Sequence, residues 1–358
     1  MDRRGAFGLT LTVLFLVGCA TVKKQPALTT PPQASDYHPS IEGKPGHVRL
    51  AFVGDINLGR RVETLLDQKG KKWLLEACKS ELDNADLVAA NLESPVGEGG
   101  APFVEKSVYL KGRSDSLDAL SYGVVGLVTL ANNHILDYGP EVAGQTRSAL
   151  TARGILSTGV VGPDIKDQTT YVRLHGLTLA FLGYCSVCPG GFGASSKRLG
   201  VETALPSVMG RGIRRAKAKA DFVIVMVHWG QEYYGVNALQ EKLAKSLSES
   251  GADLVIGSHP HVLQKAEKIG KTLVVYSLGD FVFDLRYPVC QDSCILQVDL
   301  QKNKAPKVKS VPLDLTSGRP EILKTESRQA RRIKRILEKG YEYGGRKRYP
   351  EAKPKEAE

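Results

Sequence analysis

The sequence has no apolar run long enough to cross a bilayer, which excludes a protein with several membrane spans. Its longest apolar stretch, Ala6–Gly18, has 13 residues, short of the roughly 20 that a spanning helix needs. There is also no internal repeat and no low-complexity array, so a fibre or a repetitive array is excluded. What is present, 42% apolar and 24% charged residues among 358, is typical of a globular chain with a sizeable core. This length allows one large α/β domain or two smaller domains.

The short apolar stretch is instead typical of a bacterial export signal. Two arginines precede it, and it ends in Leu16-Val17-Gly18-Cys19. Residues 1–19 thus resemble a lipoprotein signal, in which Cys19 becomes the lipidated N-terminus. An ordinary cleaved signal that contains a cysteine is the alternative. Both interpretations predict a protein exported from the cytoplasm, and the first predicts a lipid anchor in a membrane of the cell envelope. Export disfavours nucleic acid as a partner.

Two segments differ from the rest in composition. Residues 20–46 carry several prolines among Thr, Gln, Ser and Ala, with little to bury, and are predicted to form an extended tether. Residues 319–358 carry 13 Lys+Arg against 7 Asp+Glu, a net of +6, and predict a basic amphipathic helix followed by a disordered tail. This charge would attract lipid headgroups or a polyanionic polymer; a solvated helix packed on the domain is the alternative. Residues 47–318 are the predicted folded body.

Six cysteines are present, and five remain once Cys19 is assigned to lipidation. Four of them form two close pairs, Cys185 with Cys188 and Cys290 with Cys294. An exported protein meets an oxidising environment, so these cysteines are expected to form disulfides, either within each pair or across loops. A zinc ribbon would use the same four ligands, but the separation of the pairs exceeds the usual ribbon spacing.

Short runs rich in Val, Ile and Leu alternate with helical patterns along the body. Continuous apolar runs indicate strands that are covered on both faces, and the alternation predicts an α/β fold. One helix is predicted over Ala238–Glu249, with Gly251 placed to end it. The predicted strands are Val48–Val53, Leu87–Ala90, Val124–Leu130, Leu177–Leu182, Phe222–Val227, Leu254–Ile256 and Leu273–Tyr276.

Nearly every unusual polar residue comes directly after one of these strands. Ligand sites in open α/β sheets lie outside the carboxyl ends of the strands, so we expect the loops to converge on one crevice. The six loops carry Gly54-Asp55, Asn91-Leu92-Glu93, Asn132-Asn133-His134, His228, Ser258-His259-Pro260-His261 and Ser277-Leu278-Gly279-Asp280.

These side chains suit a two-metal hydrolytic site, because carboxylates, an amide oxygen and imidazoles form a mixed set of metal ligands. Each residue also has a structural interpretation. Asp55 could cap a helix, Asn132 and Asn133 could form an Asx turn, and His228 could be a core histidine. The run from His259 to His261 fixes two imidazoles close together, and the coincidence of six loops favours the metal site.

Taken in order, the same residues resemble the CapA family over about residues 48–283. That family is linked to poly-γ-glutamate capsule synthesis and export, and its fold is similar to that of calcineurin-like metallophosphoesterases. The resemblance implies a layered α/β domain of metallophosphoesterase type, with β-sheets flanked by helices. The motifs that carry it are Phe52-Val53-Gly54-Asp55, Asn91-Leu92-Glu93, Ala131-Asn132-Asn133-His134 with Asp137-Tyr138-Gly139, His228-Trp229-Gly230 with Glu232-Tyr233, Gly257-Ser258-His259-Pro260-His261-Val262 and Ser277-Leu278-Gly279-Asp280-Phe281.

The resemblance also implies a role for each site residue. Asp55 and His261 resemble ligands of a first metal, and Glu93 stands at the bridging position. Asn133, His228 and His259 resemble ligands of a second metal. His134 matches the catalytic histidine that acts on the oxyanion or the leaving group. Supporting positions or weak ligands are Asn57, Asn91, Asn132 and Asp280. The implied cofactors are divalent metal ions, namely Mn, Zn or Fe.

One position departs from the superfamily pattern. The motif Asp-x-His appears here as Asp55-Ile56-Asn57, so the first ion would lose an imidazole and gain at best a weak amide ligand. The affinity of the first site is therefore expected to fall, which places phosphodiester hydrolysis in doubt.

Two functions follow from these observations. The first is an exported protein of poly-γ-glutamate biosynthesis or export that uses a metal-dependent hydrolase-like site on an anionic polymer, with His134 as general acid. Amide cleavage or transfer would fit such a site, and phosphoester cleavage would use the same geometry. The second is a non-catalytic scaffold with a degenerate metal site, which binds the polymer or membrane-bound capsule synthase subunits. Asn57 and the basic tail favour the scaffold.

Overall fold

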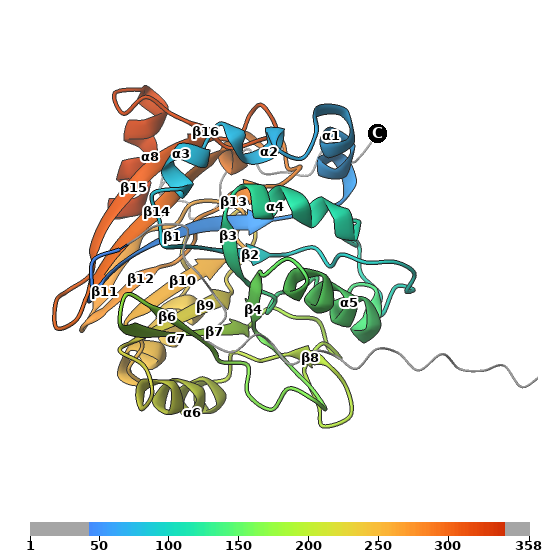
Figure 1. Cartoon of the computed structure of the whole chain (residues 1–358), viewed down its shortest axis with the longest axis horizontal. Helices are drawn as coiled ribbons and strands as arrows, with labels where there is room; N and C mark the ends of the chain where they lie inside the picture. Colours follow the sequence, from blue (N-terminus) through green and yellow to red (C-terminus); the bar gives the residue numbers. More distant parts are fainter. Residues whose placement is uncertain (1–42, 341–358) are drawn as a thin grey trace, which may run out of the picture.

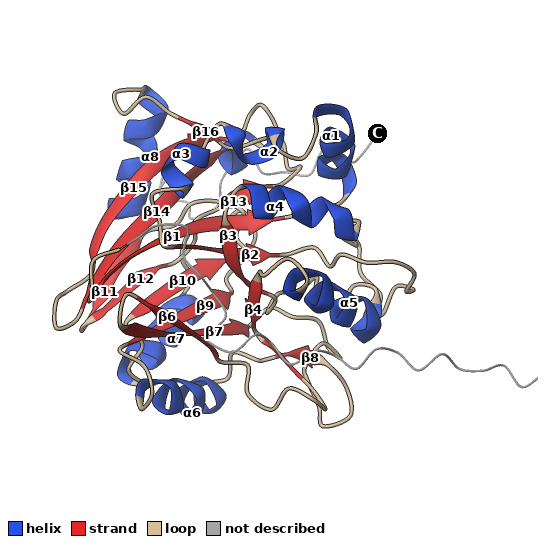
Figure 2. Cartoon of the chain, in the orientation of Figure 1, coloured by secondary structure: helices blue, strands red, loops and turns tan. Residues whose placement is uncertain are grey.

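Two β-sheets pack face to face between two layers of helices (Figure 1, Figure 2). The computed structural model describes residues 43–340. The predicted signal with Cys19, the tether up to residue 42 and the tail from residue 341 lie outside the described residues. The predicted α/β architecture of sheets flanked by helices is confirmed.

The larger sheet has eight strands and combines a parallel half with an antiparallel half. Strands β1 to β4 run parallel, β14 to β16 continue the sheet in antiparallel order beyond β1, and β13 pairs with the end of β1. The strands, in spatial order, are β16 (Glu321–Ile322), β15 (Lys307–Asp314), β14 (Asp292–Gln301), β1 (His47–Ile56), β2 (Leu87–Leu92), β3 (Val125–Thr129) and β4 (Leu156–Thr158), with β13 (Asp280–Val282) beside β1.

The smaller sheet has six strands, of which the four inner ones run parallel. Its antiparallel outer strands are β11 and β6. In spatial order the strands are β11 (Ala266–Ile269), β12 (Thr272–Val275), β10 (Leu254–Ser258), β9 (Phe222–His228), β7 (Leu177–Cys185) and β6 (Thr170–Leu174). A separate short ribbon joins β5 (Val160–Val161) to β8 (Gly200–Val201).

Alternation along the strands fills both faces of each sheet with apolar side chains. On β9, Ile224 and Met226 point into the core between the sheets, whereas Val223 and Val225 point toward the helices. Since successive side chains of a strand face opposite sides, the unbroken apolar runs in the sequence are what a doubly covered sheet requires. All seven predicted runs are strands.

The helices divide between the two outer faces. One group covers the larger sheet: α1 (Arg60–Lys69), α2 (Trp73–Glu76), α3 (Lys79–Leu82), α4 (Asp118–Tyr122) and α5 (Gly139–Thr151). Two helices cover the smaller sheet: α6 (Pro206–Lys217) and α7 (Ala238–Glu249). Helix α7 has the predicted bounds, and a capping box between Asn237 and Gln240 starts it. Short 3₁₀ turns occupy η1 (Ser114–Leu117) and η2 (Pro288–Gln291).

The basic C-terminal segment contains helix α8 (Arg328–Lys339), which begins at the Ser327 cap. Its apolar side chains Ile333, Ile336 and Leu337 are buried in the core between the sheets, and β16 just before it pairs with β15. The helix therefore closes one end of the sandwich and leaves its arginines outside. No helix within residues 43–340 is long and apolar enough to span a membrane.

The disulfide prediction is correct for one pair of cysteines and wrong for the other. Cys185, at the end of β7, is bonded to Cys188. Cys290 and Cys294 are free and buried. Cys294 lies on β14 within the core between the sheets, whereas Cys290 packs against Val262 in a different apolar cluster. The two side chains therefore belong to separate packing environments, although only three residues separate them in the sequence.

Candidate metal centre

The carboxyl ends of strands from both sheets meet along one seam. The register of the larger sheet sets Asp55 beside Asn91 on one side and beside Asp280 on the other. In the smaller sheet, His228 at the end of β9 lies beside Ser258 at the end of β10. The structure thus brings the polar residues that follow β1, β2, β3, β9, β10 and β12 to one place.

Glu93 lies at the centre of this cluster and is fully buried. Its Oε1 atom is 3.7 Å from Nε2 of His228, 3.9 Å from Nε2 of His261 and 4.0 Å from Nε2 of His134. Neither carboxylate oxygen has a hydrogen-bond partner among the described residues. Because a buried carboxylate with no partner is costly, a cation is expected to bind beside it.

Three overlapping groups of side chains could hold a metal ion. In each group the ligand atoms lie within 4.8 Å of one another, and all of the members are buried. The groups are Glu93 with His259 and His261, Asp55 with Glu93 and His228, and Asp55 with His261 and Asp280.

Two further buried atoms, Nδ1 of His259 and Oδ2 of Asp280, also lack partners among residues 43–340. These orphaned atoms and the mixed carboxylate and imidazole set fit a divalent transition metal such as Mn, Zn or Fe.

The predicted amides surround this cluster in different ways. Asn133 Oδ1 is 2.9 Å from Nε2 of His228, so it lies among the candidate ligands. Asn91 donates a hydrogen bond of 2.8 Å to Asp55 Oδ1, and Asn132 donates one of 3.1 Å to Asn91 Oδ1. Asn91 therefore orients the candidate ligand Asp55, and Asn132 holds Asn91 in place. Asp280 does the same for His261, since Oδ1 of Asp280 lies 2.8 Å from the imidazole Nδ1.

The Asn57 side chain is engaged in its own loop. Its Oδ1 accepts a 2.9 Å hydrogen bond from the backbone N–H of Gly59, and its Nδ2 donates one of 3.3 Å to Asp284. Asp284 in turn pairs with Arg60. The amide oxygen that could ligate a metal weakly is thus used to shape the start of α1.

His134 is held by two residues to which the sequence assigned no role. Its Nδ1 lies 2.6 Å from Oδ2 of Asp137, and the ammonium of Lys106 is 3.1 Å from the same nitrogen. Lys106 also pairs with Asp137 and donates a 2.6 Å hydrogen bond to the carbonyl of Asn133. Asp137 belongs to the motif Asp137-Tyr138-Gly139 that follows His134, whereas Lys106 lies in a loop whose sequence carries no motif.

Burial disturbs the protonation of the whole cluster. It raises the pKa of Glu93 well above the ordinary value, and the nearby charge of Asp55 raises it further. Burial lowers the pKa of His228 and of His259. Burial also opposes the charged form of His261, but the attraction of Asp280, Glu93 and Asp55 outweighs it and raises the pKa of that imidazole. A bound cation would reverse this balance by favouring the carboxylates and the neutral imidazoles.

The backbone of the His-Pro-His turn is strained in a way that presents both imidazoles. His259 has φ of 96° and His261 has φ of 56°, in the left-handed region that non-glycine residues seldom occupy. The backbone N–H of His259 donates a 3.0 Å hydrogen bond to Asp55 Oδ2, which ties the turn to β1. Beneath it, a Cβ atom at Gly54 would lie 2.0 Å from the Gly279 carbonyl oxygen, so only glycine lets β1 approach this loop.

The ordered ligand set and its position in the chain coincide with a known family. Residues 49–285 match the family described as bacterial capsule synthesis protein PGA_cap. This chain belongs to the PGA_cap family. The resemblance drawn from the motifs is confirmed, and every candidate ligand lies within the part that matches the family.

Relatives of this PGA_cap member support the same assignment. The chain is 34% identical over 293 residues to the PGA biosynthesis protein CapA of Bacillus subtilis (strain 168), covering 81% of this chain and 77% of that protein. It is 31% identical over 300 residues to the capsule biosynthesis protein CapA of Bacillus anthracis, covering 81% and 72%. Among solved structures, a 5'-nucleotidase precursor from Thermus thermophilus aligns with a TM-score of 0.47 at 13% identity, covering 77% of this chain and 56% of that one.

Proposed function

We propose that this chain is an exported, lipid-anchored protein of poly-γ-glutamate biosynthesis that cleaves or transfers amide bonds of the polymer at a divalent metal centre. The observation that carries the proposal is Glu93, whose buried and unpartnered carboxylate is surrounded by imidazoles. The names of the two Bacillus relatives, which refer to PGA and capsule biosynthesis, support the polymer. The Cys185–Cys188 disulfide supports an oxidising compartment, and Cys19 is the proposed lipid attachment site.

The residues divide into those that hold the ion and those that handle the proton. The proposed ligands are Asp55, Glu93, Asn133, His228, His259 and His261. A bound divalent ion supplies Lewis acidity toward a carbonyl oxygen and lowers the pKa of a bound water. His134 turns its Nδ1 toward Asp137, which leaves Nε2 facing the cluster and able to pass a proton to the leaving nitrogen. Asp137 and Lys106 keep that ring in position.

Asn57 favours a second candidate, a non-catalytic scaffold. Because its amide is engaged by Gly59 and Asp284, the first metal position lacks both the imidazole of the superfamily pattern and a replacement from this residue. A protein with such a site could bind the polymer or membrane-bound synthase subunits and hold a metal only for structure.

One comparison of variants separates the two candidates. The purified chain is loaded with Mn, Zn or Fe, and its activity is measured on γ-glutamyl oligopeptides and on a generic phosphodiester. We expect amide cleavage or transfer in the parent, and a loss of about 10²–10⁴-fold in His134→Ala, the usual contribution of a proton-transferring side chain. His47→Ala, a histidine outside the cluster that pairs with Asp299, serves as the matched control and should keep full activity. Equal background rates in the parent and in His134→Ala would favour the scaffold.

The proposed anchor is tested separately by fractionation of cells. Cys19→Ser should move the protein from the membrane fraction into the soluble exported fraction, because the substitution removes the thiol that carries the lipid. Unchanged membrane association of this variant would refute the lipid anchor without bearing on the metal centre.

A further inference from the structure

Helix α8 contributes to a concave surface rich in arginine. Four arginines of the helix line a depression of about 390 Å³, and Arg332 also lines an adjoining depression of about 470 Å³ that includes Arg61 and Arg286. We call this region the arginine surface; it consists of Arg61, Arg286, Arg328, Arg331, Arg332 and Arg335.

Most of these guanidinium groups are not neutralised by the protein. Arg332 pairs with Asp292, and Arg331 donates to the backbone carbonyl of Glu326. The other four, all exposed, form no ion pair with any residue of the described part of the chain; they are Arg61, Arg286, Arg328 and Arg335. The two adjoining depressions are therefore lined by several positive charges that no carboxylate of the described residues compensates.

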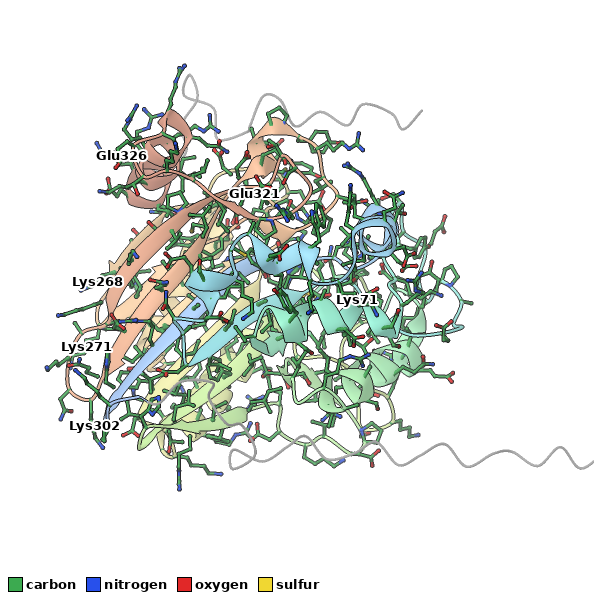
Figure 3. All side chains as sticks on the ribbon, turned by 45° about the horizontal axis from the view of Figure 1, so that its top comes forward. Lys71, Lys268, Lys271, Lys302, Glu321 and Glu326 are labelled. Atoms are coloured by element: carbon green, nitrogen blue, oxygen red, sulfur yellow. A yellow bond between two sulfur atoms is a disulfide. The ribbon has the colours of Figure 1, made fainter. Side chains whose placement is uncertain are left out.

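A second basic region differs from the arginine surface because carboxylates of the protein pair with some of its lysines. A depression of about 950 Å³ is lined by several lysines, but Lys217 pairs with Asp253 and Lys302 pairs with Asp221. In Figure 3, Lys302 lies at a lower corner of the molecule, while Glu326, just before α8, lies at the upper end. Carboxylates of the protein itself already compensate part of the lysine region, so the arginine surface is the stronger candidate for an external anion.

The arginine surface adjoins the metal centre. Arg61 follows Arg60, whose partner Asp284 also bonds Asn57, two residues from the candidate ligand Asp55. Arg286 stands two residues after Asp284. On the other side of this loop, the ring centroids of Tyr287 and Tyr233 are 5.3 Å apart. The ring centroids of Tyr233 and the candidate ligand His261 are 6.1 Å apart. The segment that follows β13 thus lines the depression and also contacts Asn57 and Tyr233, which are neighbours of the candidate ligands.

We infer that the arginine surface binds successive carboxylates of an anionic polymer and guides the chain from α8 toward the metal centre. The identity of the polymer rests on the proposed function. Guanidinium groups bind carboxylates through two parallel hydrogen bonds, and arginine is the side chain best suited to this pairing. Of the surface arginines, only Arg61 lies within the residues that match the family; Arg286 and all of α8 lie beyond them.

The geometry favours a polymer over a membrane surface. A helix that inserts into a bilayer needs apolar side chains on its exposed side. The apolar side chains of α8, Ile333, Ile336 and Leu337, are buried in the core between the sheets. What remains exposed is concave and lined by arginine, which suits a flexible chain with regularly spaced carboxylates.

The test measures binding and not catalysis. Fluorescently labelled poly-γ-glutamate is titrated with the full chain, and affinity is followed by anisotropy at several salt concentrations. We expect Arg328→Gln/Arg335→Gln to bind about tenfold more weakly and with a smaller salt dependence, the combined effect of two exposed charge contacts. The matched control is Arg211→Gln/Arg214→Gln, which removes the same charge from α6 on the opposite side of the molecule (Figure 1) and should bind like the parent.

Three results would overturn the inference: equal affinity in the α8 variant and the parent, equal weakening in the α8 and α6 variants, or arginine-dependent binding to phosphatidylglycerol vesicles without binding to the polymer. A γ-glutamyl dipeptide, too short to reach α8, separates this inference from the proposed function. If the dipeptide is turned over but the α8 variant binds polymer normally, only the arginine surface fails. If the α8 variant loses polymer binding but the parent never turns over the dipeptide, only the catalytic proposal fails.

Discussion

The imidazole Nε2 of His228 lies 2.9 Å from Oδ1 of Asn133, although the two residues are 95 positions apart and come from different sheets. His228 ends β9 of the smaller sheet, and Asn133 follows β3 of the larger one. The candidate metal centre therefore lies across the contact between the sheets. Because its ligands meet only when both sheets are packed, metal binding should be coupled to the stability of the whole sandwich.

Glu93→Gln should weaken metal binding by more than about 100-fold, beyond the usual effect of losing a residue that supports a ligand. The same change should leave the metal-free protein as stable as the parent or more stable. Burial raises the pKa of Glu93, so its charged form destabilises the metal-free fold increasingly as the pH rises above the unfolded-state pKa, and a neutral amide removes this effect.

Thermal unfolding with and without added Mn²⁺ or Zn²⁺ checks this prediction. The melting temperature of the parent should rise when metal is added, and that of Glu93→Gln should not. The exposed Glu98→Gln serves as the control and should respond like the parent. A metal-free Glu93→Gln variant that melts well below the parent would show that the carboxylate stabilises the fold by itself.

Asn57→Ala should reduce stability without changing metal affinity. The substitution removes the hydrogen bonds to Gly59 and Asp284, and each net hydrogen bond contributes about 1 kcal/mol. Urea denaturation gives the stability, and calorimetric titration with metal gives the affinity. Asp55→Asn is the comparison, since it changes a candidate ligand and should weaken binding strongly. A large loss of metal affinity in Asn57→Ala would instead identify Asn57 as a ligand.

The sequence predicted the strands and the residues at their ends because both have strong local signals. A run such as Phe222–Val227 is apolar at every position, as a doubly covered strand must be. A polar residue such as His228 at the end of such a run is therefore conspicuous. The order of the motifs then placed the chain in its family.

Other features depend on tertiary contacts that no local pattern reports. Lys106 comes from a loop 31 residues before Asp137 and reaches the site only because that loop folds over it. Cys290 and Cys294 share a spacing that suits a disulfide, yet η2 and β14 place them in different clusters. The amide of Asn57 points into its own loop because Asp284, which is 227 positions away, lies beside it.

Asp137→Asn should be strongly destabilising. The change leaves the ammonium of Lys106, whose side chain is 12% exposed, without its carboxylate partner, and breaking such a buried pair costs about 3–5 kcal/mol. The double variant Lys106→Met/Asp137→Asn should recover part of that stability, because no unpaired charge remains. Urea denaturation of the two single variants and the double variant measures the coupling. Additive losses would show that the two side chains do not act as a pair.

Metal binding should strengthen as the pH rises through neutrality. Burial raises the pKa of Asp280 to about 7 and raises that of Glu93, while carboxylates hold a proton on His261 against burial. These groups must lose their protons to bind a cation, so protons and metal compete, and affinity increases at higher pH. Calorimetry in buffers with different ionisation enthalpies should detect proton release on binding. Metal affinity that falls as the pH rises, or metal binding without proton release, would contradict this competition between protons and metal.

The cysteines of the folded protein should separate into two groups on alkylation. Cys78, Cys290 and Cys294 are buried thiols, and burial raises the pKa of Cys78 and of Cys294 to about 12, so all three should resist alkylation until the protein is denatured. Cys185 and Cys188 should resist it even in denaturant until a reductant is added, because they are bonded to each other. Mass spectrometry of the purified protein distinguishes the two groups.

The matched variant is Cys185→Ser/Cys188→Ser, in which reductant should add no further alkylation among the described cysteines. Protein recovered from a reducing cytosol should instead show all five thiols of the described residues alkylated in denaturant, since glutathione and thioredoxin keep such pairs reduced there. A bond present only in exported protein would therefore report the compartment as well as the pairing. Free thiols at Cys185 and Cys188 in protein recovered from the cell envelope would contradict both the disulfide and the proposal of an oxidising compartment.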